Sequence, residues 1–248
     1  MTVAASIPRN NVVPLWQERR YAFLQAVHSS SDYRRGRRSR RRVATSESGR
    51  ILLKRAFDVV GASLGLLLFA PLFIAVAIAI KMTSRGPVFF TQPRYGYRNT
   101  RFRIYKFRTM YMHLSDRAGT RQCDRGDPRV TPIGRLLRAT SIDELPQLIN
   151  VAMGTMSLVG PRPHVPGMLA ADVLYEDLVP YYFQRHTVRP GITGLAQVNG
   201  CRGSTAQAEN AIARVDYDLE YIETWSLWLD FKIILKTVRR EFLSGSGA

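Results

Sequence analysis

Two adjacent acids, Asp143 and Glu144, stand before a Gly-Pro-Arg-Pro turn in a chain whose formal net charge is +17. The turn places Arg162 between two prolines, whose fixed φ angles restrict the backbone around it. A rigidly presented guanidinium is suited to bidentate binding of a phosphate. Paired acids close to arginines are the composition of a phosphoryl-transfer site that needs a divalent cation.

Helix capping is the alternative role for the acid pair. The stretch "TPIGRLLRATSIDELPQLINVAM" predicts two helical segments that meet near Thr140 and Ser141. Ser141 is a good N-cap residue, and acids directly after it are favoured by the helix dipole. The second segment would face the core with an apolar stripe of Leu145, Leu148, Ile149 and Ala152. On these residues alone, capping and chemistry both remain open.

Two further stretches could contribute to a site. Residues 101–107, "RFRIYKF", alternate basic and apolar residues and predict a strand with one basic face, which would meet lipid headgroups or a phosphorylated substrate. Residues 188–200, "VRPGITGLAQVNG", contain three glycines, Arg189 and Gln197. Glycines allow a ligand to approach the backbone closely, but they serve equally well in tight turns.

An uncharged apolar segment of 22 residues, Val59–Ile80, precedes these stretches. Its length is sufficient to cross a hydrocarbon core of about 30 Å. Pro71 lies near its middle and is expected to kink a helix. Both flanks are rich in Lys and Arg, so the positive-inside rule favours keeping both in the cytoplasm. We therefore predict a re-entrant membrane hairpin that bends at Pro71, rather than a single span or a buried core helix.

The N-terminal region carries much of the positive charge. Through Arg55 there are thirteen Lys and Arg against three acids, a net +10, and the run Arg34–Arg42 reads "RRGRRSRRR". Such a run predicts a solvated, disordered arm that could bind nucleic acid or anionic lipid. The apolar segment that follows favours lipid. A nucleic-acid binder would leave that segment and the acid pair unexplained, so we expect no nucleic-acid partner.

The C-terminal stretch "YIETWSLWLDFKIILKTVRREF" predicts one more helix with an apolar face. That face would consist of Leu227, Phe231, Ile234, Leu235 and Val238. Trp225 and Trp228 are placed where a membrane interface would favour them. Docking of this helix against the rest of the protein is the alternative.

Six motifs in this order resemble the bacterial polyprenyl-phosphate sugar-1-phosphate transferases, the monotopic phosphoglycosyl transferases. They are "KRAFDVVGASLGLLLFAPLF", "GPVFFTQPRYG", "FRIYKFRTM", "SIDELPQLINVAMGTMSLVGPRP", "RPGITGLAQVNG" and "DYDLEYIETWSLWLDFKIILKTV", and they cover about residues 54–238. The basic arm lies outside the resemblance. We expect no counterpart of the large multi-span N-terminal region of longer relatives, and we therefore expect the chain to resemble the small catalytic form.

The resemblance implies an enzyme in which Asp143 attacks the sugar-bearing phosphorus of a UDP-sugar and expels UMP. The phosphate of undecaprenyl phosphate would then attack the phosphosugar–enzyme intermediate, so that one difficult step becomes two. Glu144, with Asp143, would hold Mg²⁺. Lys106, Arg138 and Arg162 would stabilise phosphate charge, with Arg189 and Gln197 as further candidates. Asp218 is a candidate for metal or nucleotide binding, or for an i,i+4 salt bridge with Arg214.

The expected fold is α+β and predominantly helical. A basic arm (1–50) would be followed by the re-entrant helix (51–83) and a cytoplasmic catalytic domain (84–243) with a short sheet and interfacial helices, at the bacterial inner membrane. Many relatives have Ser-Pro at the bend, where this chain has Ala70-Pro71, so a freed backbone carbonyl needs another partner such as Ser63 or water.

The resemblance leans towards UDP-glucose or UDP-galactose as the donor, with a UDP-acetamido sugar as the alternative, and leaves a homodimer open. From another class of function, a non-catalytic basic membrane adaptor is the rival interpretation. Both acids of the pair are present in this chain, which favours the enzyme.

Overall fold

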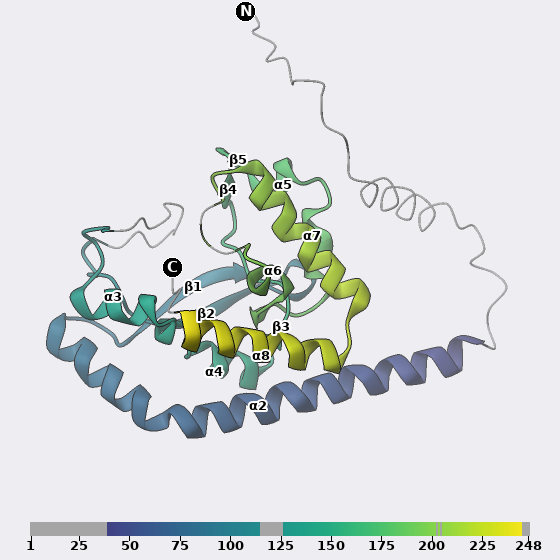
Figure 1. Ribbon diagram of the computed structural model, residues 1–248, viewed down its shortest axis with the longest axis horizontal. Coiled ribbons are helices and arrows are strands. Elements are labelled where there is room, and N and C mark those ends of the chain that lie inside the picture. The colour runs from purple at the N-terminus through teal and green to yellow at the C-terminus, as the bar shows by residue number, and fades with distance from the viewer. Residues whose placement is uncertain (1–38, 115–125, 202, 204, 245–248) are drawn as a thin grey trace, which may run out of the picture. The chain divides into compact units, whose positions relative to one another are not determined.

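The computed structural model describes residues 39–114, 126–201, 203 and 205–244. The chain divides after Ile51 into two units, and the elements below lie in the second, Leu52–Ala248, apart from the first turns of α2. Residues 1–38 of the expected arm (1–50), and the side chains of Arg34–Arg42, lie outside the described part of the chain. Residues 39–50, also expected in the arm, are instead helical and form the start of α2. Figure 1 shows the ribbon.

One long helix, α2 (Ser39–Thr83), contains the apolar segment and has Pro71 inside it. Its residues Gly49–Thr83 are long and apolar enough to cross a membrane. Figure 1 shows α2 as one continuous ribbon that bends in its C-terminal part. The structure therefore confirms a long apolar helix and shows it bent, as a single element rather than as two helices.

Strands β1 (Phe89–Tyr95) and β2 (Arg101–Phe107) form an antiparallel pair, with the 3-10 turn η1 (Tyr97–Asn99) between them. The predicted strand at 101–107 is confirmed, but its single basic face is wrong. Lys106 lies on the same side as Phe102 and Ile104, whereas Arg101 and Arg103 point to the other side, because side chains alternate along a strand. The alternation of basic and apolar residues shifts by one position at Tyr105, and Lys106 is thereby directed inward.

The acid pair lies between α3 (Pro132–Ala139) and α4 (Gln147–Met153), on the 3-10 turn η2 (Ile142–Glu144). The predicted junction near Thr140 and Ser141 is confirmed. The predicted cap is wrong, because Ser141 adopts the left-handed conformation at φ 54° and its side chain makes no capping hydrogen bond. Capping occurs instead at α3, where Gly134 N donates to Thr131 Oγ1 at 2.9 Å.

The apolar stripe expected of the segment with the acid pair is only partly correct. Leu148 is buried, but Leu145, Ile149 and Ala152 are half-buried. The second fully buried apolar residue of α4 is Val151, at 0% exposure. The difference arises because the segment does not form one α-helix: η2 and Pro146 precede α4 and change the faces that its residues present.

The remaining elements complete a fold that is mostly helical with small sheets, as expected. Strand β3 (Ser157–Val159) pairs in parallel with β6 (Gly191–Thr193), and β4 (Leu169–Ala170) pairs with β5 (Val173–Leu174). The helical elements are α5 (Tyr175–Leu178), η3 (Tyr182–Thr187), α6 (Leu195–Val198), α7 (Ala208–Thr224) and α8 (Leu227–Ser244).

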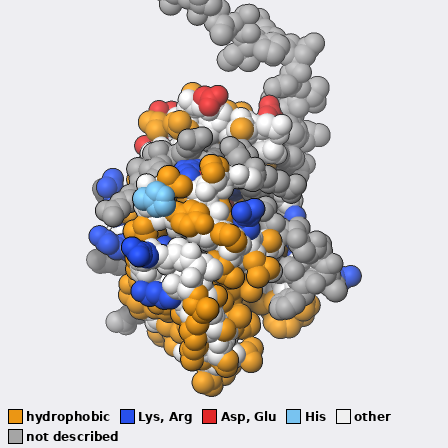
Figure 2. All heavy atoms as spheres, turned by 90° about the vertical axis from the view of Figure 1, so that its left-hand side faces the viewer, with side chains coloured by type: hydrophobic (Ala, Val, Ile, Leu, Met, Phe, Trp, Pro, Cys, Tyr) orange, Lys and Arg blue, Asp and Glu red, His pale blue; other side chains and the backbone are white. Residues whose placement is uncertain are grey.

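Apolar clusters attach α2 to the rest of this unit. Ala62 packs with Ile104, Leu148 and Met156, and further along α2 Val76 and Ile80 pack with Phe107 and Leu137. Much of the remaining surface of α2 is apolar and exposed, including Leu64, Leu67, Leu68, Ile74 and Ile78. Figure 2 shows hydrophobic side chains gathered over the bottom of the molecule, where α2 lies in Figure 1.

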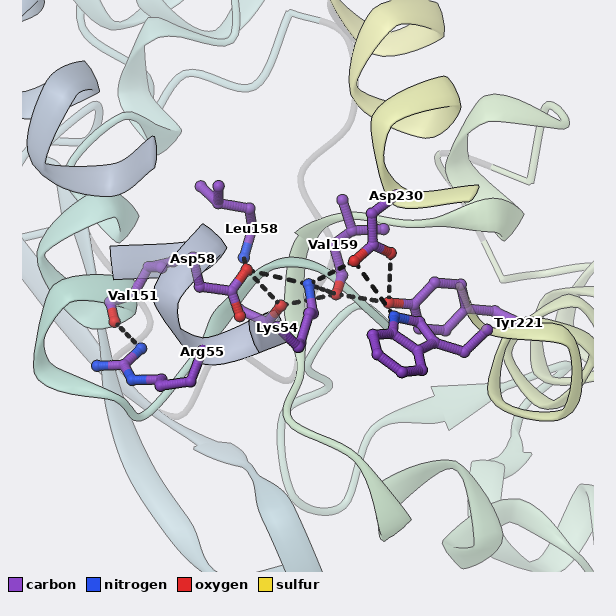
Figure 3. A network of polar contacts seen from close by, with 10 residues as sticks. Lys54, Arg55, Asp58, Val151, Leu158, Val159, Tyr221 and Asp230 are labelled. Carbon is purple, nitrogen blue, oxygen red and sulfur yellow. Dashed lines mark hydrogen bonds and ion pairs between the residues drawn. The ribbon is translucent and has the colours of Figure 1, made fainter. Parts of the chain in front are cut away.

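A polar network also joins α2 to β3, α7 and α8 (Figure 3). Lys54 Nζ lies 3.0 Å from Asp58 Oδ1 and 2.8 Å from Asp230 Oδ2. Leu158 N donates to Asp58, and Tyr221 Oη donates to Asp230 at 2.8 Å. Because both carboxylates are buried, their shared ammonium and hydrogen bonds are what make their burial tolerable.

Helix α8 docks through one face and exposes another. Asp230 and Ile233 are buried, whereas four apolar residues are exposed: Trp228, Phe231, Leu235 and Val238. Three of these four belong to the predicted apolar face. Trp225, also expected at a membrane interface, is half-buried and donates from Nε1 to Asp230 Oδ2 at 3.2 Å. The sequence pattern could not separate the two tryptophans, because only the fold places Asp230 beside the first of them.

Candidate active site

Asp143 is the acid of the pair whose carboxylate is uncommitted. Its residue is 8% exposed, and its side chain makes no hydrogen bond within the described part of the chain. Burial raises the pKa of Asp143 to about 6, and the negative charge of Glu144 acts in the same direction. The positive charges of Lys106, Arg138 and Arg162 oppose that rise in the pKa. A carboxylate with this pKa is mostly ionised at neutral pH.

Glu144 is fully engaged with cations. Lys106 Nζ lies 2.6 Å from its Oε1, Arg162 Nη1 donates to its Oε2 at 2.9 Å, and Arg162 Nη2 donates to its Oε1. Burial acts to raise the pKa of Glu144, but the charges and hydrogen bonds of Arg162 and Lys106 outweigh it and hold the pKa well below its usual range. The two neighbouring acids therefore have pKa values shifted in opposite directions, upward for Asp143 and downward for Glu144.

Three predicted phosphate ligands come together around the pair, each from a different element. Lys106 comes from β2, Arg162 from the segment after β3, and Arg138 from α3, where its Nε donates to Thr109 Oγ1 at 2.9 Å. Arg138 is among the cations that lower the pKa of Asp143. Lys106 and Arg162 are 38 and 18 residues away from Glu144 in the sequence, and both bond its carboxylate.

The structure ties the other two predicted phosphate ligands to backbone carbonyls elsewhere. Arg189 Nε donates to Gly154 O at 2.9 Å, and its guanidinium lies 5.9 Å from the ring centroid of Tyr97. Gln197 is buried and donates from Nε2 to Ile192 O at 3.2 Å. Neither of these hydrogen bonds is made to the acid pair.

Asp218 pairs with a residue other than the one that its position on the helix suggested. The expected partner was Arg214, which instead donates to Cys201 O at 3.1 Å and to Gly203 O at 3.1 Å. Asp218 accepts from Arg185 Nε at 2.9 Å. The i,i+4 spacing permits an ion pair between Arg214 and Asp218. The buried guanidinium of Arg185, on η3, binds Asp218 instead through two of its nitrogens.

Two arginines that the sequence reasoning missed lie behind Arg162. Arg94 donates from Nη1 to Pro163 O at 3.2 Å, and burial together with the charge of Arg162 lowers the pKa of Arg94 to about 10. Arg185 donates from Nη2 to Arg162 O at 2.7 Å. The only sequence signal for Arg94 was a charged residue inside the strand "FFTQPRY", and Arg185 had none.

The donor set at the acid pair fits a divalent cation that arrives with a substrate. Among the described residues there is no group of three or more His, Cys, Asp or Glu side chains that could hold a metal ion. Mg²⁺ is usually held by one or two carboxylates together with substrate phosphates, rather than by a cage made of protein alone. Asp143 fits that requirement most directly, because its oxygens accept no hydrogen bond from described residues, whereas both oxygens of Glu144 already accept from Arg162.

Comparison with known proteins places this geometry in context. Residues 49–244 match the family described as "Bacterial sugar transferase". An undecaprenyl-phosphate glucose phosphotransferase of Komagataeibacter xylinus is 54% identical over 194 residues, which are 78% of this chain and 36% of the relative. The exopolysaccharide production protein PSS of Rhizobium leguminosarum bv. phaseoli is 49% identical over 197 residues, 79% of this chain and 98% of the relative.

A third relative carries the name of a different sugar. It is a UDP-N-acetylgalactosamine-undecaprenyl-phosphate N-acetylgalactosaminephosphotransferase of Aeromonas hydrophila, 44% identical over 196 residues, which are 79% of this chain and 45% of the relative. The chain thus spans less than half the length of two of these three relatives. The family match includes the apolar part of α2 and every residue of the cluster around Asp143.

Proposed function

Because the chain belongs to the bacterial sugar transferase family, we propose that it transfers a hexose-1-phosphate from a UDP-sugar to undecaprenyl phosphate. The names of its relatives support this pair of substrates. The product would be a sugar attached through a diphosphate to the lipid carrier, which starts a polysaccharide. Involvement of a relative in exopolysaccharide production is consistent with that role.

The contrast between Asp143 and Glu144 carries the proposal. In the first step a carboxylate oxygen of Asp143 forms a bond to the phosphorus that bears the sugar, and the bond from that phosphorus to the UMP oxygen breaks. UMP leaves, and an aspartyl-phosphosugar remains. In the second step a phosphate oxygen of undecaprenyl phosphate attacks the same phosphorus, and the Asp143 carboxylate is released. An acid already neutralised by two cations, as Glu144 is, would be a poor nucleophile.

Positive charge around the pair would stabilise the transition state. The negative charge that develops on the phosphoryl oxygens can be taken up by Lys106, Arg138 and Arg162, which are already held in place before substrate binds. Cations that need no reorganisation in a partly desolvated site are the most effective form of such stabilisation. Arg162 offers a planar fork, whereas Lys106 acts as a point charge.

We further propose Mg²⁺ as the cofactor, with Asp143 and Glu144 as its protein ligands. Such an ion neutralises the diphosphate and so reduces its repulsion of an approaching carboxylate. The chain's own cations contribute to the same end, and Glu144 keeps Lys106 and Arg162 beside the diphosphate.

The membrane arrangement is also a proposal, and it rests on α2 and α8. The exposed apolar surface of α2, the bend of the helix and the basic flanks support a re-entrant helix with residues 84–243 on the cytoplasmic face of the inner membrane. The exposed face of α8 around Trp228 and Phe231 would lie at the interface. Residues 1–50, of which 39–50 belong to the start of α2, would meet anionic lipid through their basic side chains.

Glucose is the preferred sugar, with an acetamido sugar as the second candidate. The relative at 54% identity is named for glucose, whereas the relative named for N-acetylgalactosamine is 44% identical. A non-catalytic adaptor is disfavoured, because a raised pKa at an uncommitted carboxylate beside three cations has no use in an adaptor.

Release of UMP tests the function directly. Purified protein in lipid nanodiscs that contain undecaprenyl phosphate would be incubated with Mg²⁺ and, in turn, UDP-glucose, UDP-galactose, UDP-N-acetylglucosamine and UDP-N-acetylgalactosamine. We expect UMP release and a lipid-linked sugar with UDP-glucose or UDP-galactose, and neither with Asp143→Asn. Absence of UMP release with all four donors would refute the proposal, and preference for an acetamido donor would overturn the choice of sugar.

A further inference from the structure

The segment that presents Arg162 is held by its main-chain carbonyls. Pro161 and Pro163 have no backbone N–H to donate. The backbone carbonyl oxygens of residues 161–164 are therefore the main groups through which hydrogen bonds can hold this segment in place. Pro161 O accepts from Gly191 N at 2.9 Å, and His164 O accepts from Tyr95 N at 3.0 Å. These two backbone bonds anchor the ends of the segment to β6 and β1.

Between those anchors, two guanidinium groups hold the middle of the segment. Arg185 Nη2 donates to Arg162 O at 2.7 Å, and Arg94 Nη1 donates to Pro163 O at 3.2 Å. A guanidinium presents several N–H donors in a fixed plane, so each can bind a carbonyl while its other nitrogens bind elsewhere. The four carbonyls of residues 161–164 thus all have a donor.

Arg185 is buried too deeply to act on a substrate itself. Its side chain is 0% exposed, and besides Arg162 it bonds Asp218 and, at 2.8 Å, His164 Nδ1. Since Arg185 is charged when it donates to Nδ1, that nitrogen is the acceptor. The pKa of His164 is held well below its usual range by burial and then by the charge of Arg185, which keeps the ring neutral and able to accept.

A buried ion pair of this kind is an unusual choice for stability alone. Desolvation of Arg185 and Asp218 offsets much of their attraction, and apolar residues of similar size often serve a core as well or better. The pair also fixes the orientation of the Arg185 guanidinium, so that its Nη2 donates to the carbonyl of Arg162. That carbonyl belongs to the residue whose guanidinium bonds Glu144.

We propose that Arg185, fixed by Asp218, is a positioning residue that sets the main chain of Arg162 and so holds the guanidinium of Arg162 on Glu144 at the site of reaction. Arg94 supports the same segment through its hydrogen bond to Pro163 O. The kinetic consequence rests on the proposed sugar-phosphate transfer, whereas the structural consequence does not.

Hydrogen exchange tests the structural consequence without any activity. The variant Arg185→Met/Asp218→Leu removes the pair together, so no unpaired charge is left in the core. Mass spectrometry would follow peptides that contain Tyr95 and Gly191, whose amides donate to His164 and Pro161. We expect both amides to exchange faster in the variant than in the wild type, with α4 unchanged.

A matched control lies on the same helix. Asp216 is buried and accepts from Tyr181 Oη at 2.9 Å, a donor that lies outside residues 161–164. Asp216→Asn is therefore expected to leave the exchange of Tyr95 and Gly191 at the wild-type rate. A second variant, Arg185→Lys, keeps a charge beside Asp218 but loses the planar fork, and it covers the case in which the double variant does not fold.

Kinetics with and without Arg162 test the route of action. In the wild-type background, Arg185→Lys should slow phosphosugar–enzyme formation, by up to about 100-fold, because small misplacements of a positioning group have effects of that order. KM for the UDP-sugar should change less than kcat. In an Arg162→Ala background, Arg185→Lys should have little further effect, since residues that act through one another are non-additive.

The outcomes separate the two proposals. Wild-type exchange at Tyr95 and Gly191 in a folded double variant would overturn the positioning role, and so would an equal loss from Arg185→Lys with or without Arg162. If the wild type releases no UMP from any donor, the proposed function fails, and the exchange experiment still decides whether Arg185 holds the segment.

Discussion

Arg162 bonds both carboxylate oxygens of Glu144, whereas the carboxylate of Asp143, next in the chain, accepts no hydrogen bond from the described residues. The two acids share one short turn, yet the pKa of Asp143 is raised and that of Glu144 is lowered. Neighbouring titratable groups whose environments push their pKa values apart are characteristic of catalytic sites. The predictions below follow from this division.

Replacement of Asp143 by Asn should abolish formation of the covalent intermediate. Asn has nearly the same size but no anionic oxygen, so turnover should fall by on the order of 10⁴-fold or more. The measurement is incubation with UDP-glucose radiolabelled in the glucose, without lipid acceptor, followed by detection of label on the protein. Label on Asp143→Asn at the wild-type level would show that the nucleophile lies elsewhere.

The same variant should be more stable than the wild type at neutral pH. Since the folded pKa of about 6 exceeds the unfolded value of 3.8, the folded state binds more protons between these values, and stability falls as pH rises through that window. Above pH 6 the ionised Asp143 thus costs up to about 3 kcal/mol, which Asn avoids. Thermal unfolding in detergent should give a higher Tm for Asp143→Asn at pH 7.5, and a smaller difference at pH 5. A lower Tm at pH 7.5 would contradict the raised pKa.

The pH profile of the first step should move in opposite directions when the two neighbours of Asp143 are changed. Lys106 lowers the pKa of Asp143 and Glu144 raises it. With Lys106→Met the acid limb of adduct formation should therefore shift to higher pH, and with Glu144→Gln to lower pH. Both variants should also form the adduct more slowly at the pH of maximal rate. The informative quantity is therefore the pH at which the rate falls to half of each variant's own maximum. Shifts of the same sign in both would exclude Asp143 as the group that titrates.

Glu144→Gln should also respond to the concentration of Mg²⁺ if Glu144 is a metal ligand. A weakened site is filled by mass action, so part of the lost turnover should return at high Mg²⁺. Titration of UMP release with Mg²⁺ in the wild type and the variant gives the two apparent affinities. Equal affinities would assign Glu144 to the placement of Lys106 and Arg162 alone.

Replacement of Pro71 by Leu should straighten α2 and favour a full span. Cysteines would be introduced at Thr45 and at the exposed Thr91 in a chain with Cys123 and Cys201 replaced by Ser. With Pro71 present, an impermeant thiol reagent should label both from the cytoplasmic side only. In the Pro71→Leu variant the cysteine at position 45 should become reactive from the periplasm. Periplasmic labelling of that cysteine with Pro71 in place would refute the re-entrant path.

Several elements could be predicted because their signals are local. The strand 101–107, the junction near Thr140 and the apolar helix around Pro71 each follow from periodicity, propensity or length within a few turns of chain. Two predictions failed at the acid pair itself. The cap at Ser141 and the apolar stripe after it both assumed an α-helix, and the chain forms a 3-10 turn there.

The sequence by itself determined which groups are available: an acid pair, a guanidinium between prolines, a set of basic residues and an apolar helix with one proline. Only the tertiary structure decided how they are used, because ion pairs depend on burial and on which distant segments meet. Lys106 reaches Glu144 across 38 residues, and Arg185 takes the place expected of Arg214 by meeting Asp218 across 33. Among the described residues, Lys106 and Arg162 bind Glu144 and leave the carboxylate of Asp143 uncommitted. That distribution is set by the path of the backbone and by desolvation, and no local pattern encodes it.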